Sequence, residues 1–251
     1  MSMPGEWVVI VGATGAFGAV MTERLLARGL GVVAVARSAA TLAELAARHP
    51  GLVPCQADIS QDSAIEAIRA ALPGPVRMVV HGPGVAVGGG VLNIATDALV
   101  DAVNIKVGGL LRLVRAVDGH LQADSRLVAI GGHYGFEPTA YAAAAGVANA
   151  ALVNVIRQLS LAYGERGVTA HLVAPGPADT ERLHRVAADR ARMNGTTVEA
   201  VLESMKGESS IHAFTEPAQV AWALEMLLAP EARAMTGSSL MLDAGRRRGL
   251  P

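Results

Sequence analysis

The residues best suited to chemistry in this sequence are a tyrosine and two histidines near the middle of the chain. Tyr141 stands in an alanine-rich stretch, "AYAAAAGVANAAL", that spans residues 140–152 and is expected to form a helix. A free phenol has a pKa of about 10, so at neutral pH Tyr141 is a proton donor rather than a base. His133 and His81 titrate near neutrality and could donate hydrogen bonds or shuttle protons. For each histidine the alternative is a structural or solvent-facing role, which is the commoner role of a lone histidine.

Glycines gather directly after the first apolar run of the chain. The sequence "VGATGAFG" (residues 11–18) follows "WVVIV" and opens a helical pattern. Glycine allows a tight turn and a close approach of the backbone to a ligand, and a helix N-terminus offers free N–H groups to a phosphate. The position after the first strand of a strand–helix–strand pattern gives this cluster its weight. We expect Gly12, Thr14, Phe17 and Gly18 to contact a dinucleotide; the alternative is a tight turn without a ligand.

Seven short apolar runs, separated by helical patterns, must position these residues. Most are apolar throughout rather than alternating, which indicates strands that are buried on both faces. This predicts an α/β fold of three layers, a doubly wound parallel sheet of about seven strands with helices on both faces. No repeat or linker divides the chain, so we place residues 1–251 in a single domain. The predicted strands are residues 7–11, 31–36, 52–57, 77–81, 126–130, 168–174 and 239–244.

Helix start signals and one long connection complete this organisation. Thr41 with Glu44 has the spacing of a capping box, and Thr215 precedes Pro217, which we expect in the first turn of "AQVAWALEMLL". The one long polar connection between strands covers residues 177–213, and connections of that length often act as lids.

Composition excludes several classes of function. The net charge is −1, so no overall field draws the chain to nucleic acid or to a membrane. The single cysteine, Cys55, excludes an internal disulfide and fits a reducing compartment. The N-terminus lacks a basic region followed by a long apolar run, as a signal peptide would have. We therefore expect a cytoplasmic protein without a metal site.

Several motifs, in this order, resemble those of the short-chain dehydrogenase/reductase family from about Trp7 to Gly245. The family's phosphate loop reads T-G-x-x-x-G-x-G; Gly12 and Gly18 match it, whereas Val11 and Ala16 depart from it. The segments "VNIKVGG", "APGPADT" and "TGSSLMLDAG" match further motifs. The resemblance implies a Rossmann fold, a nicotinamide cofactor and a carbonyl substrate. It also implies further site residues: Asp58 and Ile59 at the adenine, Asn104 in a structural and catalytic role, and Gly82, Pro175 and Gly176 on the nicotinamide side.

The end of the second strand bears on the choice of cofactor. NAD-binding proteins commonly place an acidic residue there to hold the ribose hydroxyls. This sequence has Ala36 at that place, followed by Arg37 and Ser38. An arginine can pair with a 2′-phosphate and stack on adenine. We expect NADP(H) at Arg37 and Ser38, with NAD(H) less favoured; the alternative is that Arg37 is a solvated surface arginine.

The active-site motifs of the family have diverged here. In the family a tyrosine donates the proton, a lysine four residues later lowers the tyrosine pKa and holds the nicotinamide ribose, and a serine bonds the substrate oxygen. If Tyr141 is that tyrosine, Ala145 takes the lysine's place and Gly132, in "IGG", takes the serine's. The motif N-N-A-G reads "HGPG" at residues 81–84. A phenolate is scarce without the lysine, so we expect carbonyl reduction to be faster than alcohol oxidation.

Other residues could compensate for these losses. His133 could reach toward the substrate oxygen, and Tyr134 is a second phenol, with packing as its alternative role. Lys106 lies two residues after Asn104, which places it on another face of its helix. We take Tyr141, Asn104 and His133 as the catalytic candidates. The predicted function is an NADPH-dependent carbonyl (keto) reductase; the alternatives are a cofactor-binding pseudoenzyme or scaffold, or a non-redox lyase or isomerase.

The connection at residues 177–213 resembles the family's substrate-covering helices. Its arginines either recognise an anionic substrate such as an acyl carrier or CoA ester, or lie on a solvated helix face. By analogy with the family we expect a homodimer or homotetramer. The C-terminal "RRRGLP" is expected to be a soluble tail or a subunit contact. The arginines are Arg182, Arg185, Arg190 and Arg192, with Glu181, Asp189, Glu199 and Glu203 as balancing acids.

Overall fold

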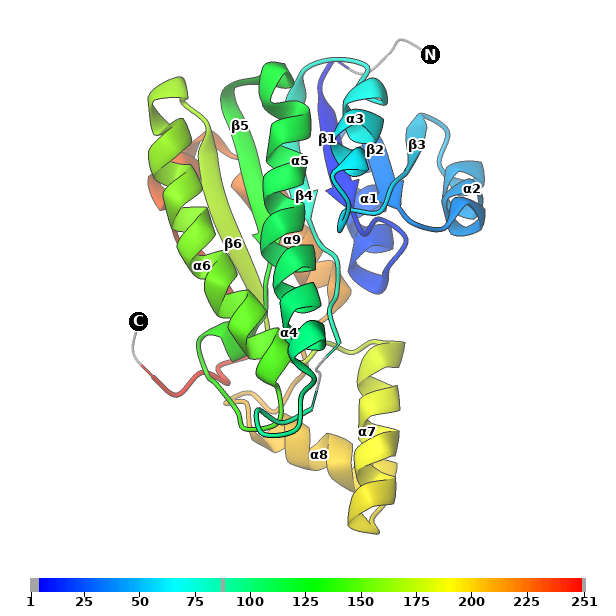
Figure 1. The fold of residues 1–251 in the computed structure, drawn as a ribbon, viewed down its shortest axis with the longest axis vertical. Helices are drawn as coiled ribbons and strands as arrows, with labels where there is room; N and C mark the ends of the chain where they lie inside the picture. The colour runs from blue at the N-terminus through cyan, green and yellow to red at the C-terminus, as the bar shows by residue number, and fades with distance from the viewer. Residues whose placement is uncertain (1–4, 87–88, 250–251) are drawn as a thin grey trace.

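The structure is a computed structural model that describes residues 5–86 and 89–249. Within them a seven-stranded, fully parallel sheet has the strand order β3-β2-β1-β4-β5-β6-β7 (Figure 1). This confirms the predicted fold class. The strands are β1 (Trp7–Val11), β2 (Gly31–Ala36), β3 (Leu52–Gln56), β4 (Val76–His81), β5 (Leu121–Ile130), β6 (Thr169–Pro175) and β7 (Ser239–Leu242). The predicted starts are within one residue of these, except that β5 begins at Leu121 rather than Arg126, because its polar first half pairs with β4 through a bulge.

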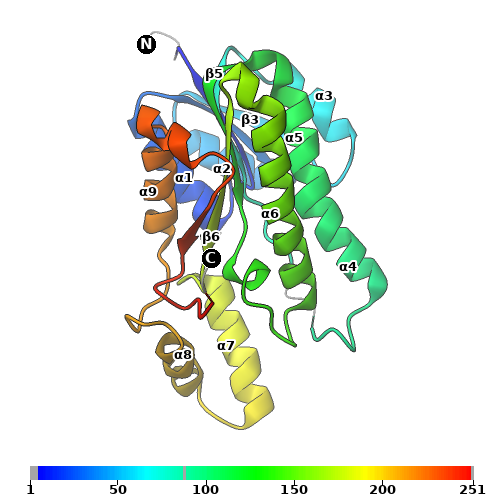
Figure 2. The same ribbon diagram turned by 90° about the vertical axis from the view of Figure 1, so that its left-hand side faces the viewer.

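Helices cover both faces of the sheet. Successive side chains of each strand point to opposite sides, so a strand that is apolar throughout presents an apolar surface on each face. In β1, Trp7, Val9 and Val11 pack against one helical layer, while Val8 and Ile10 pack against the other. Figure 2 shows the sheet edge-on between the two layers. The first layer holds α3 (Ser63–Ala70), α5 (Gly109–Val117) and α6 (Ala143–Tyr163); the second holds α1 (Ala16–Ala27), α2 (Ala39–Arg48) and α9 (Pro217–Leu227).

Two helices start differently from the sequence signals. Helix α2 begins at Ala39, and the Ser38 hydroxyl caps it by accepting from the Thr41 N–H at 3.3 Å. The predicted Thr41–Glu44 capping box is therefore wrong, because Thr41 already lies inside the helix. Pro217 does open α9, but the capping residue is Glu216, whose N–H donates to the Gln219 side chain at 2.9 Å.

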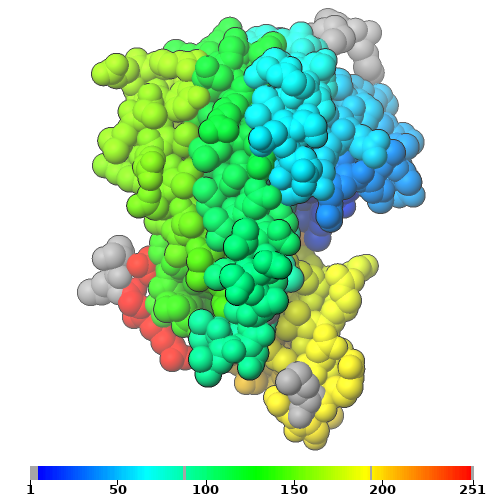
Figure 3. All heavy atoms as spheres, in the orientation of Figure 1, coloured from blue at the N-terminus to red at the C-terminus, as the bar shows by residue number. Residues whose placement is uncertain are grey.

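The connection between β6 and α9 contains two helices that extend away from the sheet. These are α7 (Glu181–Asn194) and α8 (Val198–Gly207), and they project beyond the end of the strands in Figure 1. They share a small apolar cluster of their own, which includes Leu183 and Val201. In the space-filling view, a hollow separates the yellow α7–α8 segment from the blue region of α1 and α2 (Figure 3).

The segment after β7 packs against the body of the protein. Arg246 is buried, donates to the Met205 carbonyl at 3.0 Å and pairs with Glu208. Glu137 accepts from the N–H groups of Arg248 and Gly249 at 3.0 and 2.9 Å. A free tail therefore does not fit the described residues up to Gly249, and the alternative, a subunit contact, stays a prediction. The last two residues of "RRRGLP" lie outside the described residues.

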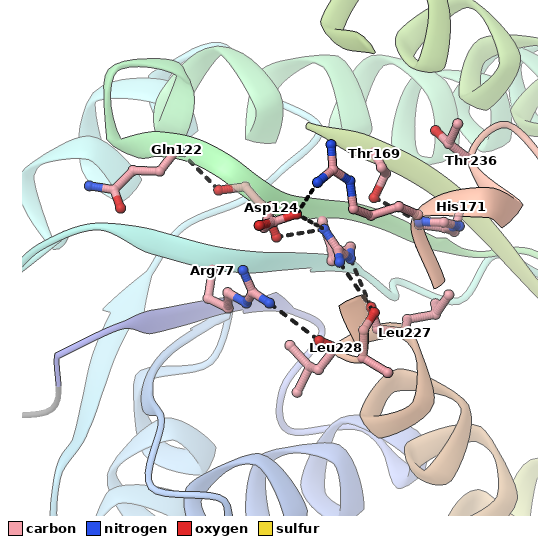
Figure 4. Close-up of polar contacts among 12 residues, drawn as sticks. Arg77, Gln122, Asp124, Thr169, His171, Leu227, Leu228 and Thr236 are labelled. Atoms are coloured by element: carbon pink, nitrogen blue, oxygen red, sulfur yellow. Dashed lines mark hydrogen bonds and ion pairs between the residues drawn. The ribbon is translucent and has the colours of Figure 1, made fainter. Parts of the chain in front are cut away.

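A polar cluster ties the amino ends of β5 and β6 to the end of α9. The fully buried guanidinium of Arg126 donates to the carbonyls of Leu227 and Asp124 at 2.8 and 2.6 Å. Arg77 donates to the Leu228 carbonyl at 3.2 Å, as Figure 4 shows. This cluster fixes the end of α9 on the sheet, away from the carboxyl ends of the strands, where the glycine turn lies. Among the helices that the structure describes, none has both the length and the apolar character to cross a membrane.

Candidate active site

The glycine turn lies where the order of the sheet reverses, between β1 and its neighbour β4. The Gly82 N–H donates to the Val11 carbonyl at 3.0 Å, which brings the turns after the two strands together. Gly12 has a φ of +85°, and a Cβ there would lie 3.2 Å from Gly82. A Cβ at Gly18 would lie 2.1 Å from the Gly12 carbonyl oxygen. Both glycines are therefore required by the close packing of this turn, at the place where doubly wound sheets bind ligands.

The turn leads into the N-terminus of α1, which is open to an anion. Gly15 precedes the helix, no side chain caps it, and its first turn carries no acidic residue. Thr14 is half-buried beside the turn, and Phe17 packs on the core below it. The first-turn N–H groups of a helix and its dipole favour a phosphate in this position.

A pocket of about 430 Å³ lies beyond the ends of β2 and β3. Its lining includes Arg37, Asp58 and Ser63. Arg37 is exposed and forms no ion pair with any residue that the structure describes. Asp58 accepts from the N–H and the hydroxyl of Ser60 at 3.0 and 2.8 Å, and these hydrogen bonds lower its pKa. The next residue, Ile59, is buried in the core.

His81, at the end of β4, is enclosed completely. Its Nε2 lies 3.0 Å from the Ile105 carbonyl and therefore carries the proton. Burial, and then the charge of Lys106, lower the pKa of His81 to about 3. At neutral pH it is an uncharged group that joins β4 to the helix above it, which favours its structural alternative.

A π-helical turn, η1 (Asn104–Gly108), follows α4 (Thr96–Val103) and directs two polar side chains to different places. Asn104 donates to the Ser60 carbonyl at 3.1 Å and accepts from Arg112 at 2.9 Å. Its side chain is committed to holding the local geometry. Such single π-turns are frequent at functional sites.

Lys106 points the other way, into the sheet edge. It is 4% exposed, and its Nζ donates to the carbonyl of Ile130, the last residue of β5, at 2.8 Å. Burial, and then the charge of Arg182, lower its pKa to about 8. The sequence placed Lys106 on a different face from Asn104, and this is so; the face is the one that meets β5.

Two phenols meet in the segment between β5 and α6. The hydroxyls of Tyr134 and Tyr141 are 2.6 Å apart, and Tyr141 as a whole residue is 37% exposed. The guanidinium of Arg190, on α7, lies 4.5 Å from the centre of the Tyr141 ring. Burial, and then the hydrogen bond to Tyr141, raise the pKa of Tyr134. Tyr141 lies just before α6, which begins at Ala143, three residues after the start of the alanine-rich stretch at Ala140.

The ring of His133 contacts that of Tyr134 at a tilt of 40°, and His133 also lines a pocket separate from the one at Arg37. The ring centroids are 4.1 Å apart, and the pocket at His133 is lined also by Glu137, Thr139 and Arg246. Burial, and then the charge of Arg246, lower the pKa of His133 to about 4, although Asp243 and Glu137 oppose this. Its imidazole is neutral at pH 7.

The α6 side chain that reaches the end of β5 is Asn149. A Cβ on Gly132 would lie 3.0 Å from Asn149 Nδ2 and 3.8 Å from the Pro175 carbonyl oxygen. Ala145, one turn earlier, lies instead in a small apolar cluster with Val85 and Tyr134. The sequence reasoning missed Asn149, and a polar residue on the buried face of an alanine-rich helix is the signal that could have found it.

The four arginines of α7 divide into two pairs. Arg185 and Arg192 lie on the solvated face, in ion pairs with Glu181 at 3.6 Å and Asp189 at 3.0 Å. Arg182 and Arg190 face the body of the protein, where Arg182 donates to the Val85 carbonyl. Neither inward arginine forms an ion pair with a residue in the described part of the chain. The solvated alternative fits Arg185 and Arg192, whereas Arg182 is exposed but bonded to the body of the protein and Arg190 is half-buried over Tyr141.

Comparison with known proteins decides the family. The family model described as enoyl-(acyl carrier protein) reductase, a short-chain dehydrogenase model, matches residues 12–247. This chain belongs to the short-chain dehydrogenase/reductase family. A putative ketoacyl reductase of Streptomyces coelicolor is 26% identical over 96% of both chains. The 3-oxoacyl-(acyl-carrier-protein) reductase of Salmonella typhimurium is 26% identical over 98% of both. An NADPH-bound short-chain oxidoreductase of Pseudomonas aeruginosa, described as containing an atypical catalytic center, has a TM-score of 0.86 at 22% identity and 99% coverage of both chains.

The short-chain dehydrogenase site of this chain fits a dinucleotide. A side chain at Gly18 would fill the turn, the α1 N-terminus is uncapped, and the next pocket presents Arg37. Directly after β6, the Gly176 N–H donates to the Leu242 carbonyl at 2.9 Å, and a Cβ on Gly176 would lie 2.9 Å from the Asp243 backbone. In the part of the chain that the structure describes, no three His, Cys, Asp or Glu side chains gather as metal ligands.

Proposed function

We propose that this short-chain dehydrogenase/reductase reduces a ketone on a small-molecule substrate, with NADPH as the reductant and Tyr141 as the proton donor. Two relatives that span the full chain are described as a ketoacyl reductase and a 3-oxoacyl-(acyl-carrier-protein) reductase. The observation that carries the proposal is the pair of hydroxyls on Tyr134 and Tyr141, 2.6 Å apart, in the segment that follows β5.

The phenol pair supports the direction of the reaction. Carbonyl reduction consumes one proton at the carbonyl oxygen, and a neutral phenol supplies it. Because burial raises the pKa of Tyr134, this phenol keeps its proton at neutral pH and can donate a hydrogen bond to the Tyr141 oxygen when that oxygen has given its proton to the substrate. Tyr141 then regains a proton from solvent, to which it is exposed. When bound, NADPH supplies the hydride to the carbonyl carbon.

Arg190 can take over part of the task of the family's lysine. When Tyr141 donates its proton, its oxygen becomes negative, and a cation beside the ring stabilises that charge. The Arg190 guanidinium is placed for this by α7, at 4.5 Å from the ring. The segment that holds Arg190 therefore completes the site, which supports its role as a substrate-covering segment.

The preference for NADPH rests on Arg37. It stands at the N-terminus of α2, where the helix dipole also favours a phosphate. The Ser38 hydroxyl accepts the capping hydrogen bond and keeps its own proton for a phosphate oxygen. The homodimeric or homotetrameric state and the cytoplasmic location stay predictions by analogy with the family.

The proposal is tested by NADPH oxidation with a panel of ketones that includes acetoacetyl-CoA. We expect Tyr141→Phe to lower kcat about 10²-fold or more, while NADPH affinity, measured by calorimetry, is unchanged. Tyr163→Phe is the matched control, because Tyr163 lies at the far end of α6, which Tyr141 precedes, and donates to Asp118 at 2.8 Å. Full turnover by Tyr141→Phe would remove the proton-donor role, and a panel without any turnover would remove the reductase proposal.

A further inference from the structure

Lys106 carries a buried charge that no acidic side chain in the described part of the chain balances. The residue is 4% exposed, and its Nζ donates one hydrogen bond, to the Ile130 carbonyl at 2.8 Å. The other N–H groups of the ammonium have no partner among the described residues. With a pKa of about 8, it is still mostly protonated at pH 7. A buried charge without a counter-charge is costly, and it becomes favourable when an anion binds beside it.

Arg182 brings a second cation to the same place from α7. It donates to the Val85 carbonyl, and its guanidinium lies 3.1 Å from the point that a Cβ on Gly84 would occupy. These two residues follow β4, which pairs with β5, so Arg182 lies over the turn beside the carbonyl that Lys106 contacts. The charge of Arg182 acts on Lys106, and neither side chain forms an ion pair with a residue that the structure describes. Two like charges that face each other repel unless an anion lies between them.

The position of this cation pair separates it from the phosphates of the cofactor. In the sheet order β5 is two strands from β1, or about 10 Å at the usual strand spacing, and the glycine turn that faces the pyrophosphate follows β1. Arg37, proposed for the 2′-phosphate, follows β2, which is one strand farther away. The pair therefore lies on the substrate side, under α7. Because Lys106 is almost enclosed, a compact anion fits this place better than a bulky phosphate ester, and a guanidinium pairs well with a planar carboxylate.

We propose that Lys106 and Arg182 together bind a carboxylate of the substrate, so that the ketone which this protein reduces belongs to a keto acid. This inference rests on the proposed ketone reduction and names its substrate class. The two cations recognise the carboxylate by charge and hydrogen bonds, and they take no part in the transfer of hydride or proton. Because Arg182 belongs to α7, the bound carboxylate also holds the covering segment against the turn after β4.

The test compares keto acids with their methyl esters, which keep the ketone and lose the charge. The pairs are acetoacetate with methyl acetoacetate and levulinate with methyl levulinate, which differ in the spacing between carboxylate and ketone. For one pair or both, kcat/KM of wild type should be at least about tenfold higher with the acid than with the ester.

Two variants remove one charge each. In Lys106→Met and in Arg182→Gln the ratio of acid to ester should fall at least about tenfold, while kcat/KM for the ester changes by less than about threefold. Arg185→Gln, on the solvated face of α7, is the matched control and should leave the ratio unchanged. Lys106→Met should keep or raise Tm, because an apolar chain of similar size replaces a buried charge without a counter-charge. Arg182 is exposed, so its variant provides the test if Lys106→Met does not fold.

Two readouts separate this inference from the proposed function. The first is turnover: if the esters are reduced as fast as the acids, or if the folded variants keep the wild-type ratio, the carboxylate site is overturned while the reductase stands. The second is binding, measured by titrating the NADP⁺-bound protein with acetoacetate and levulinate in a calorimeter. We expect Kd for the acid to rise at least about tenfold in Arg182→Gln, with NADP⁺ affinity unchanged. This result without any turnover supports the carboxylate site but not the reduction. A loss of NADP⁺ affinity in place of acid affinity would assign the pair to the cofactor and overturn the inference, as would the absence of binding by both acids.

Discussion

Replacing Arg37 by glutamine tests the choice of cofactor directly, because it removes a charge and leaves the fold intact. Arg37 is exposed after the last residue of β2 and forms no ion pair within the described part of the chain. The substitution therefore breaks no ion pair, and what it removes is the charge of Arg37, which acts on Asp58 in the same pocket. Its main-chain carbonyl accepts from the Gln56 side chain at 3.1 Å, and this hydrogen bond survives the substitution.

The expected effect follows from the strength of a charged hydrogen bond. Such bonds contribute about 1.5–3 kcal/mol, which corresponds to about 10- to 150-fold in Kd. Because Arg37 is exposed and screened by salt, we expect the lower part of that range for NADPH, about 10- to 30-fold. NADH lacks the 2′-phosphate, so its Kd should change by less than about twofold.

The assay is a calorimetric titration of wild type and Arg37→Gln with NADPH and NADH at low and high salt. The NADPH advantage of wild type should shrink with salt, because the screening length falls from about 10 Å at 0.1 M to about 3 Å at 1 M. Arg48→Gln, at the exposed far end of α2, is the matched control. Equal losses for the two cofactors, or no loss, would refute the assignment of Arg37 to the phosphate.

Three further predictions concern the scaffold. Gly18→Ala should lower Tm, because the new Cβ would lie 2.1 Å from the Gly12 carbonyl oxygen. At a temperature where the variant is folded, calorimetry should detect no heat of NADPH binding, and normal NADPH binding would show that the glycine turn does not hold the cofactor. Burial lowers the pKa of His81 to about 3 and of His171 to about 4 from 6.5, so the unfolded chain takes up protons that the folded chain excludes. The free energy of unfolding should therefore fall as pH falls from 7 to 5, by about 2 kcal/mol for each histidine. Urea denaturation at the two pH values measures this, and in His171→Gln the loss between pH 7 and pH 5 should be smaller by about 2 kcal/mol. Arg126→Met should lower the free energy of unfolding by about 3 kcal/mol in the same assay, because it leaves buried carbonyls unpaired. A loss below about 1 kcal/mol would show that this polar cluster does not stabilise the fold.

The fold could be predicted from the sequence because its signals are local. Apolar runs such as "WVVIV" and "GVVAVA" alternate with helical patterns, and each run became a strand of the parallel sheet. The errors fell at the ends of elements, where capping depends on a single side chain. Ser38 rather than Thr41 caps α2, and the polar first half of β5 hides its start.

The candidate site was predictable only where it is built from consecutive residues. The glycine turn at residues 11–18 is one continuous segment, and a backbone rule identifies it. Lys106 was weighed from spacing alone, whereas its burial at the end of β5 depends on how a π-helical turn packs on the sheet. The spacing from Tyr141 directed attention to Ala145, which lies in an apolar cluster.

The layered fold, the glycine turn after β1 and the long connection after β6 could be predicted from the amino-acid sequence, because periodicity and glycine content act over a few residues. Which side chains meet at the site depends on the tertiary structure. Asn149 reaches Gly132, and Arg190 reaches Tyr141, across contacts between residues far apart in the chain. Such contacts are set by how α6 and α7 dock beyond the sheet, and docking depends on the shape of the whole core rather than on any local pattern.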